Sequence, residues 1–292
     1  MILQSEIFKI AEKEGVPPDT IDKNWVLGHF LAELFSADWA SNSLIFKGGT
    51  CLKKCYFPDY RFSEDLDFTL VNPDIIITNK TIQTVCNNIT DKIGIPFSNV
   101  QITPLLWNNK SVGYSSQIKY WGANHKKNQH VLPFNRWHTS IKIEIITYKK
   151  VANTPELRPL DSPFSDFSLF DHIKIPCYSI SEIIAEKFRA LLQRSYPAPR
   201  DYFDLWYLLK FEENINWNKI ISTFIQKADF KHIKLKSYED FFDQGQLKKV
   251  KQAWKNSLQN LLKENSLPEF DLVINELKDI CQKNQWDEAS SK

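Results

Sequence analysis

The chain has 292 residues, 42% of them hydrophobic, and a formal net charge of +2. This length and apolar content suffice for one large domain or two smaller ones with a sizeable core. A net charge so near zero excludes attraction of nucleic acid by the field of the whole molecule, so such a contact would need a local basic patch.

No segment of the sequence has the character of a secretion signal or a membrane anchor. Residues 1–15 lack a sustained apolar stretch, and no apolar run approaches the roughly 20 residues of a membrane span. We therefore expect a soluble, cytoplasmic protein without a membrane partner.

The cysteines lack C-x-x-C spacing, which favours reduced thiols packed as small apolar side chains. Cys51 and Cys55 are spaced i, i+4 on a predicted helix, but a zinc site would need two further ligands, and none has suitable local spacing. The cysteines are Cys51, Cys55, Cys86, Cys177 and Cys281.

The first half of the sequence alternates between predicted helices and strands. Apolar residues recur at helical spacing over residues 20–40, after a Pro-Pro-Asp start signal. The next predictions, in chain order, are a strand over 44–47, a short helix over 50–56, a strand over 62–71, a helix over 78–93, and strands over 100–107, 116–121 and 140–148.

Residues 153–176 contain four prolines and little periodicity, so we interpret them as a connector between two halves. Beyond it, apolar spacing predicts mostly helices. These cover 181–194, 200–211, 217–228, 237–263 with a break near Gly245, and 272–284. The sequence thus predicts an α/β domain over residues 1–175 and a helical domain over residues 176–292.

Asp65 and Asp67 lie two residues apart on the predicted 62–71 strand, which also carries Ser63. Side chains at i and i+2 share a strand face, so the two carboxylates would project side by side. A divalent cation would offset their repulsion. A structural ion pair explains a D-x-D triplet equally well, and the spacing leaves both interpretations open.

Gly48, Gly49 and Thr50 connect a predicted strand to a predicted helix. Glycines before a helix can offer bare backbone N–H groups to a phosphate, although a Gly-Gly pair is also a common turn. The spacing matches neither G-x-x-x-x-G-K-[ST] nor G-x-G-x-x-G. Its interest lies in its place directly before the D-x-D strand.

Glu144 lies on an alternating strand, on the face opposite Ile141, Ile143 and Ile145. If this strand neighbours the D-x-D strand, a third carboxylate joins the pair, and three carboxylates can hold two Mg²⁺ ions. Spacing alone favours the alternative, a solvated face shared with Lys142.

The predicted helix over 181–194 carries Lys187 at the border of its apolar stripe. A lysine there can lay its stem on the core and extend its ammonium toward a polyphosphate, or simply reach solvent. Arg200 and Asp204 are spaced i, i+4 on the next helix, which by default is a surface pair.

Two basic segments could contact RNA or could be solvated surface. In the loop over 121–138, cations alternate with aromatic residues, a pattern that suits single-stranded nucleic acid. The second runs from Lys227 to Lys255, and its default interpretation is a wet helical surface. The loop residues are Trp121, His125, Lys126, Lys127, His130, Phe134, Arg136, Trp137 and His138.

Four blocks in this order, FKGGTCLKKCY, RFSEDLDF, SEIIAEKFRALLQR and RDYFDLW, span about residues 44–209. Together they resemble the AbiEii family, nucleotidyltransferase toxins of the polymerase-β-type superfamily. The resemblance implies an α/β (α+β) nucleotidyltransferase-type domain with a small mixed sheet, followed by a mainly helical domain, with the active site in the groove between them.

The resemblance also implies roles for individual residues. Gly48, Gly49 and Thr50 match the phosphate-binding turn, although many superfamily members have Gly-Ser there and the hydroxyl of this chain comes one position later. Lys187 matches a lysine at the nucleotide, and Asp204 a functional acid. The metal-binding positions are Asp65, Asp67 and, on a less specific strand, Glu144; Ser63 and Arg200 complete the expected nucleotide-binding set.

The activity implied is Mg²⁺- or Mn²⁺-dependent transfer of NMP from an NTP to an RNA hydroxyl, with the 3′ end of tRNA as expected acceptor. The role implied is that of a toxin in a toxin–antitoxin or abortive-infection system, with an antitoxin that need not touch it. A kinase-like phosphotransferase is an alternative, but no H-R-D-like loop is present. A non-catalytic nucleic-acid- or partner-binding module on the same fold is another, against which the intact carboxylates argue.

Overall fold

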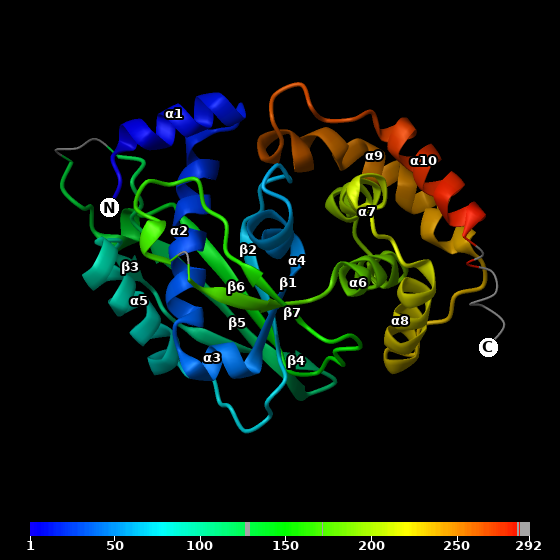
Figure 1. Ribbon diagram of the computed structural model, residues 1–292, viewed down its shortest axis with the longest axis horizontal. Helices are drawn as coiled ribbons and strands as arrows, with labels where there is room; N and C mark the ends of the chain where they lie inside the picture. The colour runs from blue at the N-terminus through cyan, green and yellow to red at the C-terminus, as the bar shows by residue number, and fades with distance from the viewer. Residues whose placement is uncertain (126–128, 171, 285, 287–292) are drawn as a thin grey trace. The chain divides into compact units, whose positions relative to one another are not determined.

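The computed structural model describes residues 1–125, 129–170, 172–284 and 286, and the chain divides into two compact units (Figure 1). Unit 1 comprises residues 1–149 and 155–177, and unit 2 comprises residues 150–154 and 178–292. Unit 1 is a mixed sheet with helices, and unit 2 is helical. The predicted fold class, mixed α/β followed by a helical region, is confirmed.

The described part of unit 1 contains an eight-stranded mixed sheet in the order β3-β5-β6-β2-β1-β8-β7, with β4 paired to β5. The neighbours β1/β2 and β5/β6 are antiparallel, whereas β2/β6 and β1/β8 are parallel. The strands are β1 Leu44–Lys47, β2 Asp65–Leu70, β3 Phe97–Ser98, β4 Ile102–Trp107, β5 Lys110–Tyr120, β6 Ser140–Ile146, β7 Glu156–Pro159 and β8 Lys174–Cys177.

The segment interpreted as a connector is in fact part of the sheet. Its ends form β7 and β8, and β8 pairs with β1 so that Cys177 lies opposite Phe46. Each of these strands has only four residues and contains a proline, Pro159 or Pro176. Strands that are so short and that contain a proline show no alternating pattern. The prediction of a connector was wrong because these strands leave no periodic signal in the sequence.

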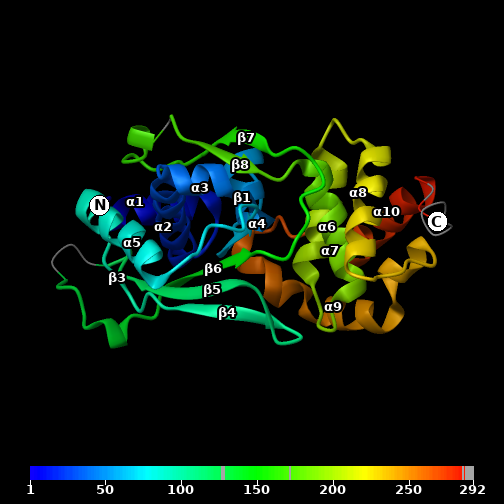
Figure 2. The ribbon, with the colours of Figure 1, turned by 90° about the horizontal axis from the view of Figure 1, so that it is seen from below.

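Helix α2, Pro18–Phe35, is the central helix of unit 1. Almost every residue after its first turn is buried, as expected for a helix that is apolar on all sides. It contacts α1, α5 and β6 and lies across the β5–β6 part of the sheet (Figures 1 and 2). The unit's other described helices and helical turns are α1 Gln4–Glu14, which the sequence analysis missed, α3 Asp38–Ser43, α4 Gly48–Cys51, the π-helical turn η1 Leu52–Tyr56, α5 Asn79–Ile93, and the 3₁₀ turns η2 Phe134–Arg136 and η3 Ser168–Phe170.

The helices of unit 2 confirm the predicted spans to within a few residues, and the predicted break falls at Asp243, which caps α9. They pack on an aromatic cluster of Phe188, Phe224, Phe241 and Trp286. The helices are α6 Ile180–Gln193, α7 Pro199–Phe211, α8 Trp217–Phe230, the 3₁₀ turn η4 Tyr238–Phe242, α9 Gln244–Leu258, the turn η5 Gln259–Leu261 and α10 Phe270–Lys283.

Glu182 joins residues 150–154 to the helices of unit 2. Its buried carboxylate accepts hydrogen bonds from the backbone N–H groups of Ala152 and Asn153, both at 2.9 Å. Lys227 forms an ion pair with it at 2.7 Å. Lys227 is itself buried, so its placement on a wet basic surface was wrong.

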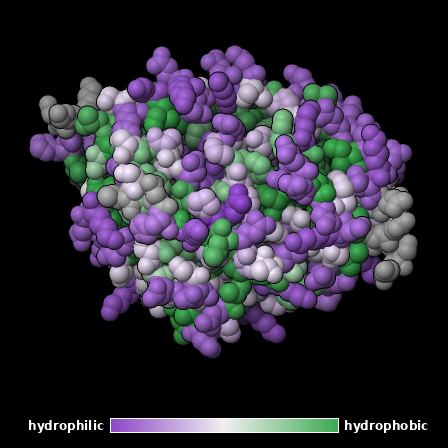
Figure 3. Space-filling view, in the orientation of Figure 1, coloured by the Kyte–Doolittle hydropathy of each residue, from purple (hydrophilic) through white to green (hydrophobic). Residues whose placement is uncertain are grey.

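The face of the molecule drawn in Figure 3 is covered mainly by hydrophilic side chains, with small apolar areas between them. Among the described helices, none is both long enough and apolar enough to cross a bilayer.

Replacing Glu182 with alanine should destabilise unit 2, because the buried Lys227 would lose its nearer counter-charge and keep the more distant Glu186 at 3.5 Å. Removing one partner of a buried ion pair costs about 3–5 kcal/mol. Urea unfolding followed by tryptophan fluorescence measures the loss. The exposed Glu264 provides a matched control, and E264A should change the stability little. Equal losses in the two variants would contradict the anchoring role of Glu182.

Candidate functional site

The register of three adjacent strands aligns charged residues in a row across the sheet. Asp67 on β2 lies opposite Lys47 on β1 and opposite Glu144 on β6. Residues paired across neighbouring strands project from the same face, here the face opposite the buried isoleucines of β6. The sequence interpretation of Glu144 as a third acid required β6 to neighbour β2, and the two strands are direct neighbours. Asp65, two residues before Asp67, lies opposite Lys142.

The glycine turn packs directly against this row, where α4 lies beside β1 and β2 (Figure 1). Gly48 has φ +82°, and a Cβ atom on it would lie 2.5 Å from Oδ2 of Asp67. A Cβ atom on Gly49 would lie 2.9 Å from Oγ of Ser63. Only glycine fits at Gly48, because a side chain would strain the backbone and collide with the carboxylate. The structure thus brings Gly48, Gly49, Ser63 and Asp67 together.

Thr50 has a role that the sequence analysis missed. Its buried hydroxyl donates a hydrogen bond to the backbone carbonyl oxygen of Asp65 at 2.5 Å. This bond holds the first turn of α4 against the start of β2, so the glycines and the acids keep a fixed spacing. The Thr50 hydroxyl is therefore already engaged, whereas the Ser63 hydroxyl lies against the turn itself.

Glu144 forms an ion pair with Lys142 at 2.5 Å, and this hydrogen bond raises the pKa of the lysine. Both side chains are partly exposed, so the pair contributes at most about 1 kcal/mol. Glu144 therefore lies beside Asp67, as a third acid would, and it also forms the partly exposed pair with Lys142 that the sequence suggested. Among the described residues, the oxygen atoms of the three acids do not all lie within 4.8 Å of one another.

The surroundings of Asp67 disfavour its charged form. Burial, the largest effect, raises its pKa to about 6. The positive charges of Lys47 and Lys149 lower the pKa, and the charges of Glu144 and Asp65 raise it. Carboxylate oxygens are the ligands that Mg²⁺ and Ca²⁺ prefer. Asp65, Asp67 and Glu144 therefore fit a divalent cation, which would stabilise the charged form of Asp67.

Lys187 is the centre of a second charged cluster, in unit 2. Its ammonium donates to Oδ1 of Asp201 at 3.2 Å and to Oδ2 of Asp204. Arg194 pairs with the other oxygen of Asp201 at 2.7 Å. Pro199 begins α7, so Asp201 and Asp204 lie one turn apart on a shared helix face.

Asp204 is fully buried, which rules out the default interpretation of it as an exposed surface residue. Sequence reasoning also missed Asp201 and Arg194 as partners in the Lys187 cluster, although the spacing of the two aspartates was a usable signal. Sequence reasoning also missed Lys47. A lysine at the end of the otherwise apolar β1 strand was the feature that could have indicated it.

The predicted site residues divide between the units. Unit 1 carries seven of them, and unit 2 carries Lys187, Arg200 and Asp204. The seven are Gly48, Gly49, Thr50, Ser63, Asp65, Asp67 and Glu144.

The aromatic residues of the 121–138 loop do not share one role. Trp137 is buried, and its indole N–H donates to the carbonyl oxygen of Leu132 at 2.7 Å, which makes it a structural residue. Phe134 is exposed, and the Trp121 ring packs on His125. Lys126 and Lys127 lie outside the described residues.

Without divalent cations, D67N should be more stable than the wild type at pH 7.5 by about 1–3 kcal/mol. The folded-state pKa of Asp67 lies above its ordinary value of 3.8. Native protein therefore binds more protons between about pH 4 and pH 6, and stability falls as the pH rises through this window. The difference between variant and wild type should vanish near pH 4, which urea unfolding at the two pH values measures.

The exposed Asp74 provides the control, since D74N should behave like the wild type at both pH values. Adding Mg²⁺ at pH 7.5 should stabilise the wild type and leave D67N unchanged. A D67N protein no more stable than the wild type at pH 7.5 would contradict the raised pKa of Asp67.

The solved structures show relatives of the same fold. The nucleotidyltransferase toxin MenT4 from Mycobacterium tuberculosis H37Rv matches with a TM-score of 0.64 and 18% sequence identity, over 100% of this chain and 95% of that chain. JHP933 from Helicobacter pylori matches with a TM-score of 0.55 and 16% identity, over 92% and 93% of the two chains. The chain thus has a nucleotidyltransferase-like fold.

A search of the curated proteins finds no match. The sequence model described as "Nucleotidyl transferase AbiEii toxin, Type IV TA system" matches residues 29–276, which is most of the chain. It covers the glycine turn, the row of acids and the Lys187 cluster. The protein therefore belongs to the AbiEii family of nucleotidyl transferase toxins of Type IV toxin–antitoxin systems.

Proposed function

We propose that this toxin uses a divalent cation to transfer NMP from an NTP to a hydroxyl of RNA, with the 3′ end of tRNA as acceptor. The observation that carries the proposal is the contact between the glycine turn and Asp67, in the row that Asp67 shares with Glu144. A turn without side chains beside a set of acids suits a triphosphate and its cation.

Asp65 and Asp67 would hold Mg²⁺ or Mn²⁺, and Glu144 would join them by leaving its weak pair with Lys142. When bound, the cation offsets the charge of the acids and polarises the phosphoryl oxygens. Alternatively, Glu144 would act as the base that accepts the proton of an acceptor hydroxyl, a role that suits a carboxylate on a partly exposed strand face.

The backbone N–H groups of Gly48 and Gly49 would hold the triphosphate, since no side chain blocks its approach. Because the Thr50 hydroxyl is bonded to the Asp65 carbonyl oxygen, the Ser63 hydroxyl is the better candidate to donate to a phosphate oxygen. Thr50 then serves the site by keeping the turn in place.

Lys187 would contribute a positive charge to the phosphates. Its two partners, Asp201 and Asp204, fix the ammonium group in one place, which lowers the entropy cost of binding a phosphate. In this proposal Asp204 positions Lys187, and Arg200, at the start of α7, contacts the nucleotide.

Membership of a Type IV family implies a cognate antitoxin. We propose that it opposes the toxin without direct contact, and that the pair acts in abortive infection. Co-purification of the two proteins from cells that produce both would contradict the first of these proposals.

The test of the activity incubates purified protein with Mg²⁺, total RNA and each α-labelled NTP in turn. The wild type should label RNA, and D67N should label it about 1,000-fold less, because loss of a cation ligand removes several kcal/mol of transition-state stabilisation. D67N is expected to remain folded, so its failure would report chemistry rather than unfolding.

Two outcomes would count against the proposal. Label on the protein instead of on RNA would indicate self-modification. A D65A variant that keeps full toxicity in cells would favour a non-catalytic binding module.

G48A should abolish RNA labelling, because the new Cβ atom would push the Asp67 carboxylate out of place. Gly94 is a matched control, since it has φ +85° and its nearest neighbour would lie 4.0 Å from an added Cβ atom. G94A therefore carries the same backbone strain, about 1–2 kcal/mol, without crowding the acids. Labelling assays of the two folded variants distinguish crowding from strain, and equal activities would contradict the role of the turn.

A further inference from the structure

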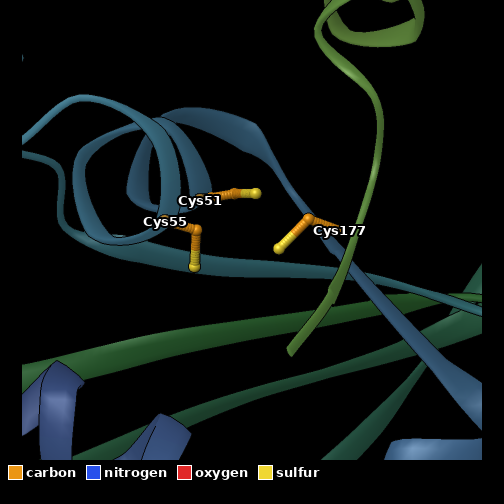
Figure 4. A group of neighbouring side chains, drawn as sticks. All are labelled: Cys51, Cys55 and Cys177. Atoms are coloured by element: carbon orange, nitrogen blue, oxygen red, sulfur yellow. The ribbon is translucent and has the colours of Figure 1, made fainter. Parts of the chain in front are cut away.

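Three cysteines from separate parts of the sequence meet inside unit 1. Cys51 ends α4, Cys55 lies in η1, and Cys177 ends β8. Their sulfur atoms all lie within 4.8 Å of one another, and all three side chains are buried (Figure 4). Within the described parts of the chain, no other His, Cys, Asp or Glu forms such a group.

Ordinary secondary structure fixes the positions of the three thiols. Cys51 and Cys55 lie one turn apart, where the helix widens into a π-helical turn, a feature common at functional sites. Cys177 reaches them because β8 pairs with β1 at Phe46. Two of the thiols donate weak hydrogen bonds to backbone oxygen atoms, Cys51 to Phe46 at 3.6 Å and Cys177 to Ile175 at 3.4 Å.

Two basic side chains lie near the cluster. The buried Lys54 lies next to Cys55 in the sequence, and Nε of Arg158 donates to the carbonyl oxygen of Cys55 at 3.2 Å. Positive charge at these positions would offset part of the negative charge that thiolate ligands bring into the protein interior.

We propose that Cys51, Cys55 and Cys177 form a binding site for one soft, thiophilic metal ion, and that Cu(I) is the ion they suit best. Thiolates select Cu(I), zinc and iron–sulfur clusters, but structural zinc sites and iron–sulfur clusters use four protein ligands. This site offers three sulfur atoms. Three thiolates bring negative charge into the site, Cu(I) offsets part of it, and the thiol protons are released on binding.

Binding would connect the helix after the glycine turn to β8, two segments that are otherwise joined through β1. The site is chemically separate from the row of acids, whose oxygen ligands suit hard cations. The proposal of a metal site at the three cysteines is therefore independent of the proposed nucleotidyl transfer.

The test titrates Cu(I) into the metal-free, reduced, full-length protein without oxygen, in competition with a Cu(I) chelator. The wild type should bind one equivalent with thiolate-to-copper absorption in the ultraviolet, and X-ray absorption should find three sulfur neighbours. A parallel titration with Zn²⁺ should bind more weakly. Failure of Cu(I) to bind, two sulfur neighbours, or tighter binding of Zn²⁺ would each overturn the proposal.

C177A and C55S should each weaken Cu(I) binding at least about 100-fold, since even groups that only support metal ligands contribute about 10- to 100-fold. Cys86 and Cys281 are buried free cysteines outside the cluster, so C86A and C281A are matched controls and should bind like the wild type. Unchanged binding by C177A would overturn the site. If a variant fails to fold, the sulfur count on the wild type decides alone.

Discussion

The close approach of the Gly48 backbone to the Asp67 carboxylate is the constraint on which the candidate site depends. An added Cβ atom would lie 2.5 Å from the carboxylate oxygen, so the turn and the acid can occupy these positions only while residue 48 is glycine. The bond from Thr50 to the Asp65 carbonyl oxygen maintains the same approach from the other side. Two local contacts thus set the distance between the glycine turn and the strand that carries Asp65 and Asp67.

The same constraint explains why the charged form of Asp67 is disfavoured. Packing against the turn takes the carboxylate out of water, which raises its pKa, and the strand register adds Glu144 beside it. The positive charges of Lys47 and Lys149 oppose this effect in part. Acids whose pKa is raised in this way occur often at functional sites, although structural ion-pair networks also produce them.

Much of the fold follows from patterns that can be seen in the sequence. The helices over 180–283 and the alternating strand over 140–146 were predicted because their periodicity is long and regular. The strands β7 and β8 were missed because four residues with a proline show no period. Helix α1 was missed because it buries only Ile7 and Ala11.

The sequence indicated which residues belong to the candidate site, but it did not indicate most of the contacts between them. D-x-D spacing placed two acids on one face, but the neighbouring position of Glu144 depends on the pairing of β2 with β6, which lie far apart in the sequence. The third cysteine of the thiol cluster was invisible for the same reason, since Cys177 arrives on β8. Lys227 is buried beside its ion-pair partner Glu182, and no local sequence pattern predicts that these two residues meet.

The path of the chain through residues 150–154 has a consequence for how the protein can be divided. These residues belong to the helical unit, although the sheet resumes after them. Glu182 and Lys227 both take backbone partners from this short excursion. A fragment that starts after β8 would therefore lack part of its own interior, so the helical unit is discontinuous in sequence and cannot be excised by a single cut.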